Sequence, residues 1–268
     1  MKVAAIQMVS GISLDHNLAQ AHELLDQARL AGAELVVLPE YFCFMGHNDR
    51  DKLLLAETPG LGTVQDFLAD TAREMGLWIV GGTLPMATED PHHAANASVV
   101  YNPKGQAVAR YDKMHLFRYD NGREFYDEAA VLSAGPSTVA FDLNDRQHQS
   151  WRVGLSICYD LRFPELYRTL GADVIVVPSA FTFTTGQAHW EVLLRARAIE
   201  NQAYVIASAQ GGNHENGRRT WGHTMIIDPW GTVLSQQASG PGAVVCELDR
   251  QHLEAVRQQL PALQHRRL

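Results

Sequence analysis

Apolar runs rich in valine and isoleucine alternate with amphipathic stretches along this chain. Residues 2–8 are the first apolar run and predict a buried strand. Residues 15–31 then place apolar side chains every three to four positions, which is typical of a helix that ends before Gly32. Residues 34–38 predict the next strand. The apolar face of the helix comprises Leu18, Ala21, Leu24, Leu25 and Ala28. Such alternation is typical of layered α/β architecture.

The same unit of strand and helix recurs further along the chain, and two hairpins accompany it. One hairpin joins strands at 96–101 and 107–111 through Asn-Pro-Lys-Gly, and residues 226–234 repeat this pattern around Asp-Pro-Trp-Gly. The remaining elements are helices at 63–75, 164–170 and 187–201, and strands at 77–81, 152–157, 174–177, 204–209 and 224–228. We expect two sheets packed face to face with helices on both outer surfaces, a four-layer αββα sandwich.

Composition restricts the class of protein. The 268 residues are 46% hydrophobic and 19% charged, which suits one domain spanning residues 1–268. The net charge of -8 is spread along the chain, so a nucleic-acid partner is not expected. Three cysteines without regular spacing predict free thiols in a reducing, cytoplasmic compartment. We expect neither a signal peptide nor a membrane-spanning segment.

Cys158 is the first candidate for chemistry. It lies where the strand WRVGLSI ends and a helix follows, the place where α/β sheets present nucleophiles and ligands. The adjacent helix N-terminus or a nearby cation would favour its thiolate. A buried structural cysteine is the competing interpretation, and we adopt it for Cys43 and Cys246.

Two further strand ends carry complementary groups. Glu40 directly follows the strand ELVVLP and has the chemistry of a general base, although a solvated loop acid would fit the same position. Lys113 follows residues 107–112, where its ammonium could stabilise an oxyanion. His115 is a rival partner for the thiol, because a Cys and His pair is the commoner way to activate sulfur.

Three motifs resemble, in order and spacing, those of the nitrilase, or carbon–nitrogen hydrolase, superfamily. They are LPEYF around Glu40, YDKMHLF around Lys113 and SICYDLRFPEL around Cys158. The resemblance extends from residue 2 to the C-terminal LPALQHRRL. It implies the αββα fold, with Glu40 as base, Cys158 as nucleophile, and Lys113 with the backbone N–H of Tyr159 as oxyanion donors. It also implies a second acid, for which Glu128 competes with two neighbours. Those neighbours are Glu124 and Asp127.

The implied reaction is amide hydrolysis through a thioester, and it requires no cofactor or metal. The twelve histidines lack the spacing of metal ligands, and we interpret His92 and His93 as surface residues. A binding protein on the same fold and a Cys and His amidotransferase remain rival hypotheses. Replacing His115 would distinguish the second of these.

The second half of the chain resembles the branch of the superfamily that contains deaminated glutathione amidases and omega-amidases, and the SAQ run at 208–210 favours the former. The resemblance implies a small-molecule amide substrate with a carboxylate. Tyr159, Arg162 and Thr182 are the expected substrate-binding residues, and Arg218 is a further cation. Arg162 could instead pair with Glu165. Two other arginines, Arg195 and Arg197, are expected to be structural or solvated.

The same resemblance implies a homodimer. Members of the superfamily pack sandwich against sandwich around the helix after the nucleophile and the C-terminal tail. Residues 163–170 and the tail from about residue 250 carry apolar faces that are compatible with such burial.

Overall fold

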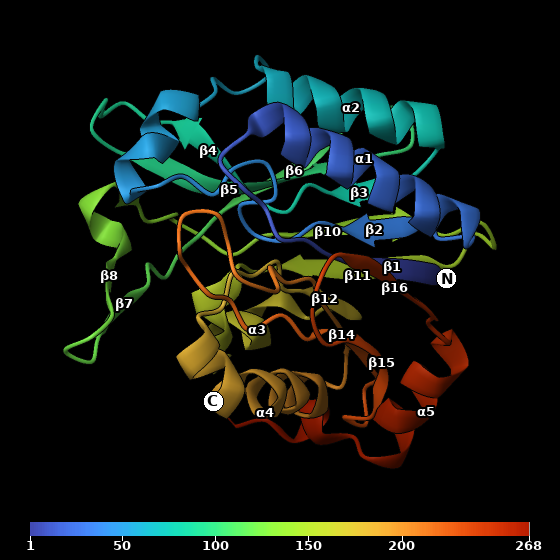
Figure 1. The fold of residues 1–268 in the computed structure, drawn as a ribbon. Coiled ribbons are helices and arrows are strands. Elements are labelled where there is room, and N and C mark those ends of the chain that lie inside the picture. The colour runs from blue at the N-terminus through green and yellow to red at the C-terminus, as the bar shows by residue number, and fades with distance from the viewer. Residues whose placement is uncertain (268) are drawn as a thin grey trace.

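The computed structural model of the protein describes residues 1–267. Two β-sheets pack face to face, and helices cover both outer surfaces (Figure 1). The predicted αββα sandwich is therefore confirmed. Leu268, the last residue of the expected C-terminal tail, lies outside the described residues.

The first sheet is built from the N-terminal half of the chain and one C-terminal strand. Its strand order is β16-β1-β2-β3-β5-β4, and β6 and β9 also pair with β5. Strands β1, β2 and β3 are parallel, so their carboxyl ends meet at one edge of the sheet. The strands are β1 (Lys2–Gln7), β2 (Leu35–Val37), β3 (Trp78–Val80), β4 (Leu84–Ala87), β5 (Ala94–Tyr101), β6 (Ala107–Asp112), β9 (Leu132–Ser133) and β16 (Gly242–Glu247).

The second sheet contains six strands in the order β10-β11-β12-β13-β14-β15. Its central strands β11, β12 and β13 are parallel, which again gathers their carboxyl ends at one edge. The strands are β10 (Ala140–Asn144), β11 (Ser150–Leu155), β12 (Val174–Val176), β13 (Tyr204–Ala207), β14 (Thr224–Ile227) and β15 (Val233–Gln237).

Helices form the two outer layers (Figure 1). The helices α1 (Leu14–Leu30) and α2 (Thr63–Met75) cover the first sheet, whereas α3 (Pro164–Leu170) and α4 (Phe183–Asn201) cover the second. The apolar face predicted for α1 is buried. The helix α5 (Arg250–Gln259) follows β16. Residues 1–267 also contain four short 3-10 helices: η1 (Asp49–Leu55), η2 (Glu128–Ala130), η3 (Cys158–Arg162) and η4 (Ala262–His265).

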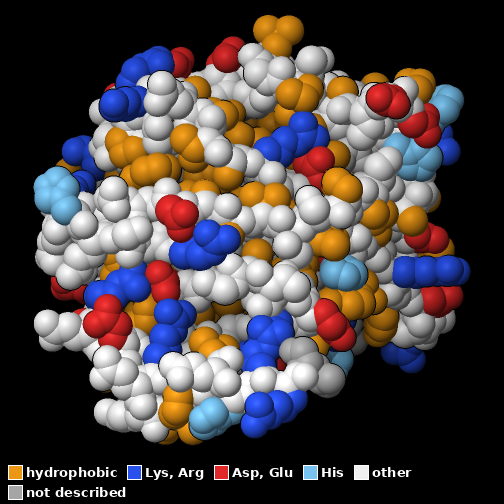
Figure 2. Space-filling model, turned by 180° about the vertical axis from the view of Figure 1, so that it is seen from behind, with side chains coloured by type: hydrophobic (Ala, Val, Ile, Leu, Met, Phe, Trp, Pro, Cys, Tyr) orange, Lys and Arg blue, Asp and Glu red, His pale blue; other side chains and the backbone are white. Residues whose placement is uncertain are grey.

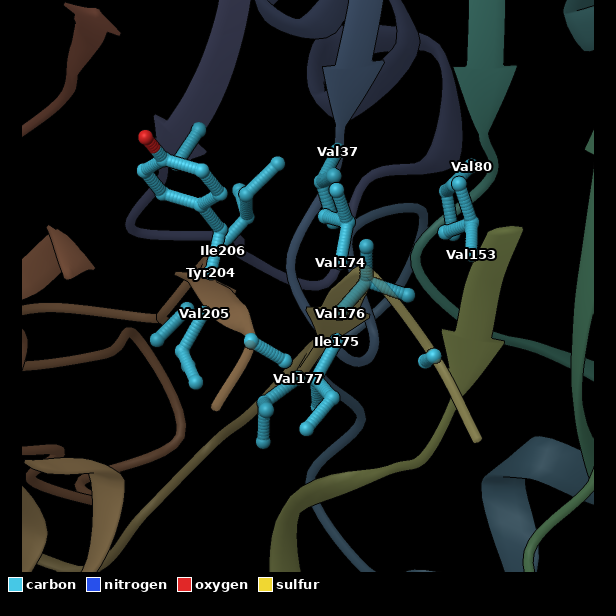
Figure 3. Packing of buried hydrophobic residues seen from close by; sticks show 14 of the residues in the cluster. Val37, Val80, Val153, Val174, Ile175, Val176, Val177, Tyr204, Val205 and Ile206 are labelled. Atoms are coloured by element: carbon cyan, nitrogen blue, oxygen red, sulfur yellow. The ribbon is translucent and has the colours of Figure 1, made fainter. Parts of the chain in front are cut away.

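Aliphatic side chains from both sheets form the core between them. Figure 3 shows Val37 and Val80 of the first sheet and Val153 and Val176 of the second in one buried cluster. Each such side chain contributes about 1.5–3 kcal/mol when it is removed from water. A separate cluster fills the space between α1, α2 and the first sheet. Because both faces of the sheets are covered at their centres, the central strands such as β2, β12 and β13 read as continuous apolar runs.

The two predicted hairpins are stabilised in the same way. Asn102 accepts hydrogen bonds from the backbone N–H groups of residues 104 and 106, and Asp228 accepts them from those of residues 230 and 232. In each case a short polar side chain replaces backbone acceptors in a tight turn, as the Asx-Pro-x-Gly pattern predicts.

Several elements differ from the sequence prediction. The strands β4, β10 and β16 and the helix α5 were not predicted, and α4 begins at Phe183 rather than at residue 187. The earlier start follows from Thr182, whose hydroxyl accepts a hydrogen bond from the N–H of Thr185 and caps the helix. Residues 113–135 are not a plain loop, because they form a hairpin of β7 (Arg118–Asp120) and β8 (Phe125–Asp127) and then η2.

The surface carries charges of both signs. Acidic and basic side chains lie beside one another over much of the face in Figure 2. Within the described part of the chain, every helix is too short or too polar to cross a lipid bilayer.

Candidate active site

The ends of three strands position the principal side chains of the site. Glu40 follows β2 of the first sheet, and Lys113 follows β6 of the same sheet. Cys158 follows β11 of the second sheet and begins η3. The close packing of the two sheets therefore brings together residues that are far apart along the chain.

Lys113 forms the centre of a buried ionic cluster. Its Nζ lies 2.9 Å from Oε1 of Glu40 and 2.8 Å from Oε2 of Glu128. Burial lowers the pKa of Lys113, but the charges of Glu128 and Glu40 outweigh burial and raise it well above its usual value. Burial likewise opposes ionisation of Glu128, whereas Lys113 and Lys52 hold its pKa below the usual value. The lysine is therefore an ammonium shared by two carboxylates.

The Glu40 carboxylate is held on both oxygens. Its Oε1 accepts hydrogen bonds from Lys113 Nζ and from Asn96 Nδ2, each at 2.9 Å. Its Oε2 accepts one from the backbone N–H of Ala180 at 2.8 Å. Glu40 is 1% exposed, so these donors fix its orientation toward Cys158 without competition from water.

Cys158 lies in a tight turn and is 8% exposed. Its φ of 47° is in the left-handed region, which a residue with a side chain rarely adopts. Burial raises the pKa of the Cys158 thiol well above its usual value, and the negative charge of Glu40 and a hydrogen bond to it act in the same direction, whereas Lys113 opposes them. The nearby cation therefore favours the thiolate, as expected, but burial and Glu40 outweigh it.

Glu128 is the acid that the fold brings to Lys113. It also accepts a hydrogen bond from the Tyr41 hydroxyl at 2.9 Å and one from the backbone N–H of Phe117 at 2.7 Å. The two competing acids lie elsewhere in the hairpin. Glu124 bonds to Thr184 and Asn121, and Asp127 lies 3.9 Å from Arg118.

His115 has a different partner from Cys158. Its Nδ1 lies 2.7 Å from Oδ1 of Asp160, and its ring stacks on Phe163 at 3.7 Å between centroids. Asp160 is fully buried and also accepts from the Tyr111 hydroxyl and from the N–H of Ile157. The His115 imidazole therefore helps to brace the turn that carries the cysteine.

A pocket of about 540 Å³ opens beside Cys158. A second pocket of about 200 Å³ shares Cys158 and Thr182 with it and is lined by the aromatic rings of Phe117, Tyr159 and Phe181. Two of the three expected substrate-binding residues, Tyr159 and Thr182, thus line a pocket next to the thiol.

Arg162 lines neither of these two pockets. Its guanidinium lies 3.3 Å from the His189 ring and over the rings of Tyr159 and Phe181. None of the ion pairs among the described residues joins it to Glu165. The expected pairing with Glu165 is therefore wrong, because the guanidinium stacks on the aromatic wall of the smaller pocket.

The other arginines named from the sequence divide into two groups. Arg218 lines the larger pocket. Arg195 donates to the carbonyl of Gly231, and Arg197 donates to that of Leu161. The last two therefore have structural contacts, as expected.

Several residues that line or support the site were not identified from the sequence. Asp49, Lys52, Tyr126 and Arg219 line the larger pocket, and Asn96 holds Glu40. The i, i+3 spacing of Asp49 and Lys52 after Asn48, a helix-capping residue, would have placed the pair on one face of a short helix. Nothing in the sequence indicates that this face meets the active site.

The remaining titratable residues do not form a metal centre. Among residues 1–267, no group of three or more His, Cys, Asp or Glu side chains is arranged to hold a metal ion. His92 is exposed, and His93 pairs with Asp90 at the surface, as expected. Cys43 is buried, and burial raises the pKa of its thiol to about 12, which agrees with a structural role.

Comparisons with known proteins identify the family that the chain resembles. A family model of carbon–nitrogen hydrolases matches residues 2–258. A deaminated glutathione amidase of Synechocystis sp. is 45% identical over 269 residues, which cover 98% of this chain and 97% of that protein. The human deaminated glutathione amidase is 39% identical and covers 99% of this chain and 82% of that protein. The crystal structure of Saccharomyces cerevisiae Nit3, a member of branch 10 of the nitrilase superfamily, has a TM-score of 0.89 at 29% identity and covers 100% of this chain and 97% of that chain.

Proposed function

The chain belongs to the carbon–nitrogen hydrolase family, and on that premise we propose that it hydrolyses deaminated glutathione to 2-oxoglutarate and cysteinylglycine. The observation that carries the proposal is the meeting of Glu40, Lys113, Glu128 and Cys158 beside one pocket. The curated relatives named for this activity support the choice of substrate, because they match nearly the whole chain.

In the first half of the reaction, Cys158 is the nucleophile. Its Sγ forms a bond to the amide carbon while Glu40 accepts the thiol proton, and the carbonyl electrons move onto oxygen. Lys113 and the backbone N–H of Tyr159 stabilise this oxyanion. When the carbon–nitrogen bond breaks, Glu40 returns the proton to the leaving amine, and a thioester remains. The raised pKa of the thiol makes proton transfer to Glu40 a necessary part of this step.

In the second half, water replaces the amine. Glu40 takes a proton from water as its oxygen adds to the thioester carbon, and Lys113 again stabilises the oxyanion. Collapse breaks the carbon–sulfur bond, and the sulfur recovers the proton from Glu40. Glu128 acts as a positioning residue, because its contacts with Lys113 Nζ and Tyr41 hold the ammonium between the two acids.

The substrate assignment is tested by comparing kcat/KM for deaminated glutathione with that for α-ketoglutaramate, using purified protein and the Cys158→Ser variant as the blank. We expect release of 2-oxoglutarate from both and a preference for deaminated glutathione. A strong preference for α-ketoglutaramate would make omega-amidase the better assignment. Release of neither product from any short amide, with no alkylation of Cys158 by iodoacetamide, would favour a binding protein.

We further propose a homodimer and a reducing, cytoplasmic setting. The three cysteines are free, and the segments around α3 and η4 are the expected contact region. Light scattering at micromolar protein should give twice the chain mass of 29.7 kDa. A mass of one chain across that range would remove the dimer from the proposal.

A further inference from the structure

One wall of the larger pocket carries a compact group of charges that the mechanism does not use. Lys52 and Asp49 come from η1 in the first half of the chain, and Arg218 comes from the loop after β13. Lys52 Nζ lies 3.2 Å and Arg218 2.7 Å from the same oxygen, Oδ1 of Asp49. Two cations therefore share one acid at the pocket wall, and together these three groups carry a net positive charge.

These cations are held in place by neighbouring aromatic rings. Lys52 Nζ lies 4.2 Å from the centre of the Tyr41 ring, and the Arg218 guanidinium lies 5.6 Å from that of Tyr126. The Lys52 side chain is only 6% exposed, so its ammonium interacts with a bound group with little screening by water. Tyr41 also donates to Glu128, which connects this wall to the catalytic cluster.

The loop that carries Arg218 is fixed to the other half of the molecule. Asn216 donates to the carbonyl of Gly46, and the His214 ring contacts the carbonyl of Ser10 at 2.9 Å. The guanidinium is therefore presented to the pocket by a braced loop, which favours recognition of a particular ligand geometry.

We propose that Lys52 and Arg218 form a subsite that binds the 2-oxo acid end of the substrate and discriminates against an α-amino acid end. This inference rests on the proposed function and names the residues that recognise the 2-oxo acid end of the substrate. The carboxylate of such an acid accepts hydrogen bonds from both cations, and its neutral ketone oxygen is a further acceptor. Intact glutathione places an ammonium where the ketone would lie, and that charge is repelled by Lys52 and Arg218.

The acids of this wall offer such an ammonium little compensation. The charge of Asp49 is already engaged by the two cations, and those of Glu40 and Glu128, which also line the pocket, are engaged by Lys113. Asp127 lies 3.9 Å from Arg118. Arg219, the other cation of the lining, packs on the Phe183 ring and adds to the positive charge. Discrimination would thus follow from unfavourable charge as much as from attraction.

The test compares kcat/KM for deaminated glutathione and for glutathione in the wild-type chain and in Lys52→Gln, Lys52→Arg and Arg218→Gln. Lys104→Gln is the matched control, because Lys104 is exposed on the β5–β6 turn. We expect kcat/KM for deaminated glutathione to fall about tenfold to a hundredfold in both Gln variants, the range for a lost hydrogen bond between charged groups. The ratio should fall as well, because each Gln variant repels the ammonium of glutathione less. Lys52→Arg should retain part of the ratio, and the control should retain all of it.

Inhibition by 2-oxoglutarate provides a readout that does not depend on turnover. Its inhibition constant should rise by the same factor in Lys52→Gln and Arg218→Gln. If Lys52→Gln fails to fold, Arg218→Gln decides alone, because its side chain is 26% exposed. If the wild-type chain is active and the Gln variants keep its kcat/KM ratio and its inhibition constant, the subsite is overturned and the proposed function stays intact. No wild-type hydrolysis of deaminated glutathione would overturn both.

Discussion

Replacing Glu40 with Gln separates the two effects that this carboxylate has on Cys158. Glu40 is the proposed base, and its charge also raises the pKa of the thiol. Removing that charge should lower the pKa of Cys158, so that the thiolate forms at lower pH while the base is lost. Amide hydrolysis and simple alkylation of the sulfur are therefore expected to change in opposite directions.

The size of each change follows from the contacts. A general base contributes about a hundredfold to ten-thousandfold, or about 3–5 kcal/mol of transition-state stabilisation. In Glu40→Gln the new NH₂ group must face either the N–H of Ala180 or the donors of Lys113 and Asn96. At least one buried donor then loses its acceptor, which costs about 1–3 kcal/mol of folding free energy. Lys113 keeps Glu128 as its counter-ion, so the variant should fold.

The assay measures three quantities on wild type, Glu40→Gln and the exposed control Glu191→Gln: kcat for the amide, the urea midpoint, and the iodoacetamide rate against pH. We expect kcat to fall at least about a hundredfold in Glu40→Gln. The inflection of the alkylation profile should move to lower pH, while the control follows wild type. Folded Glu40→Gln with kcat within tenfold of wild type, or an inflection at higher pH, would refute the reasoning.

His115→Ala should lower kcat by less than about a hundredfold, whereas Cys158→Ser should abolish hydrolysis; an equal loss in a steady-state assay would favour a Cys and His pair. Gly82→Ala should cost roughly 1–3 kcal/mol in urea unfolding, because φ is 52° and a Cβ would lie 2.2 Å from the carbonyl oxygen of Pro39. Burial raises the pKa of Asp49, but Lys52 and Arg218 outweigh it and hold the pKa below 3.8. The stability difference between wild type and Asp49→Asn, measured by urea unfolding, should therefore be full at neutral pH and shrink below about pH 4.

The positions of Glu40, Lys113 and Cys158 at the ends of strands could be predicted because strand periodicity and the following turn residues are local signals. Parallel strands place their carboxyl ends at one edge, which made these residues candidates. Their meeting across the two sheets was implied by the resemblance to carbon–nitrogen hydrolases. The net direction of the pKa shift of Cys158 could not be predicted. It depends on burial and on the acid opposite it, and neither can be obtained from the residues next to the cysteine.

The choice among three neighbouring acids illustrates the same limit. Which one reaches Lys113 depends on the register of the β7–β8 hairpin, where the backbone N–H of Glu128 bonds to the carbonyl of Phe117. A shift of one residue would turn a different carboxylate toward the ammonium, because successive side chains of a strand point to opposite faces. The sequence shows neither the hairpin nor its register clearly, since its strands are short and polar.

The pocket wall formed by Lys52, Asp49 and Arg218 is harder to predict from the sequence than the residues at the strand ends. Lys52 and Arg218 lie far apart along the chain and meet only because the loop after β13 packs on the first half. Nothing in the sequence indicates that Lys52 reaches the active site, and Arg218 could be named only as one possible cation for the substrate carboxylate. Local signals at strand ends indicate the reaction. If this wall selects the substrate, the choice of amide depends instead on long-range packing between the two halves of the sandwich.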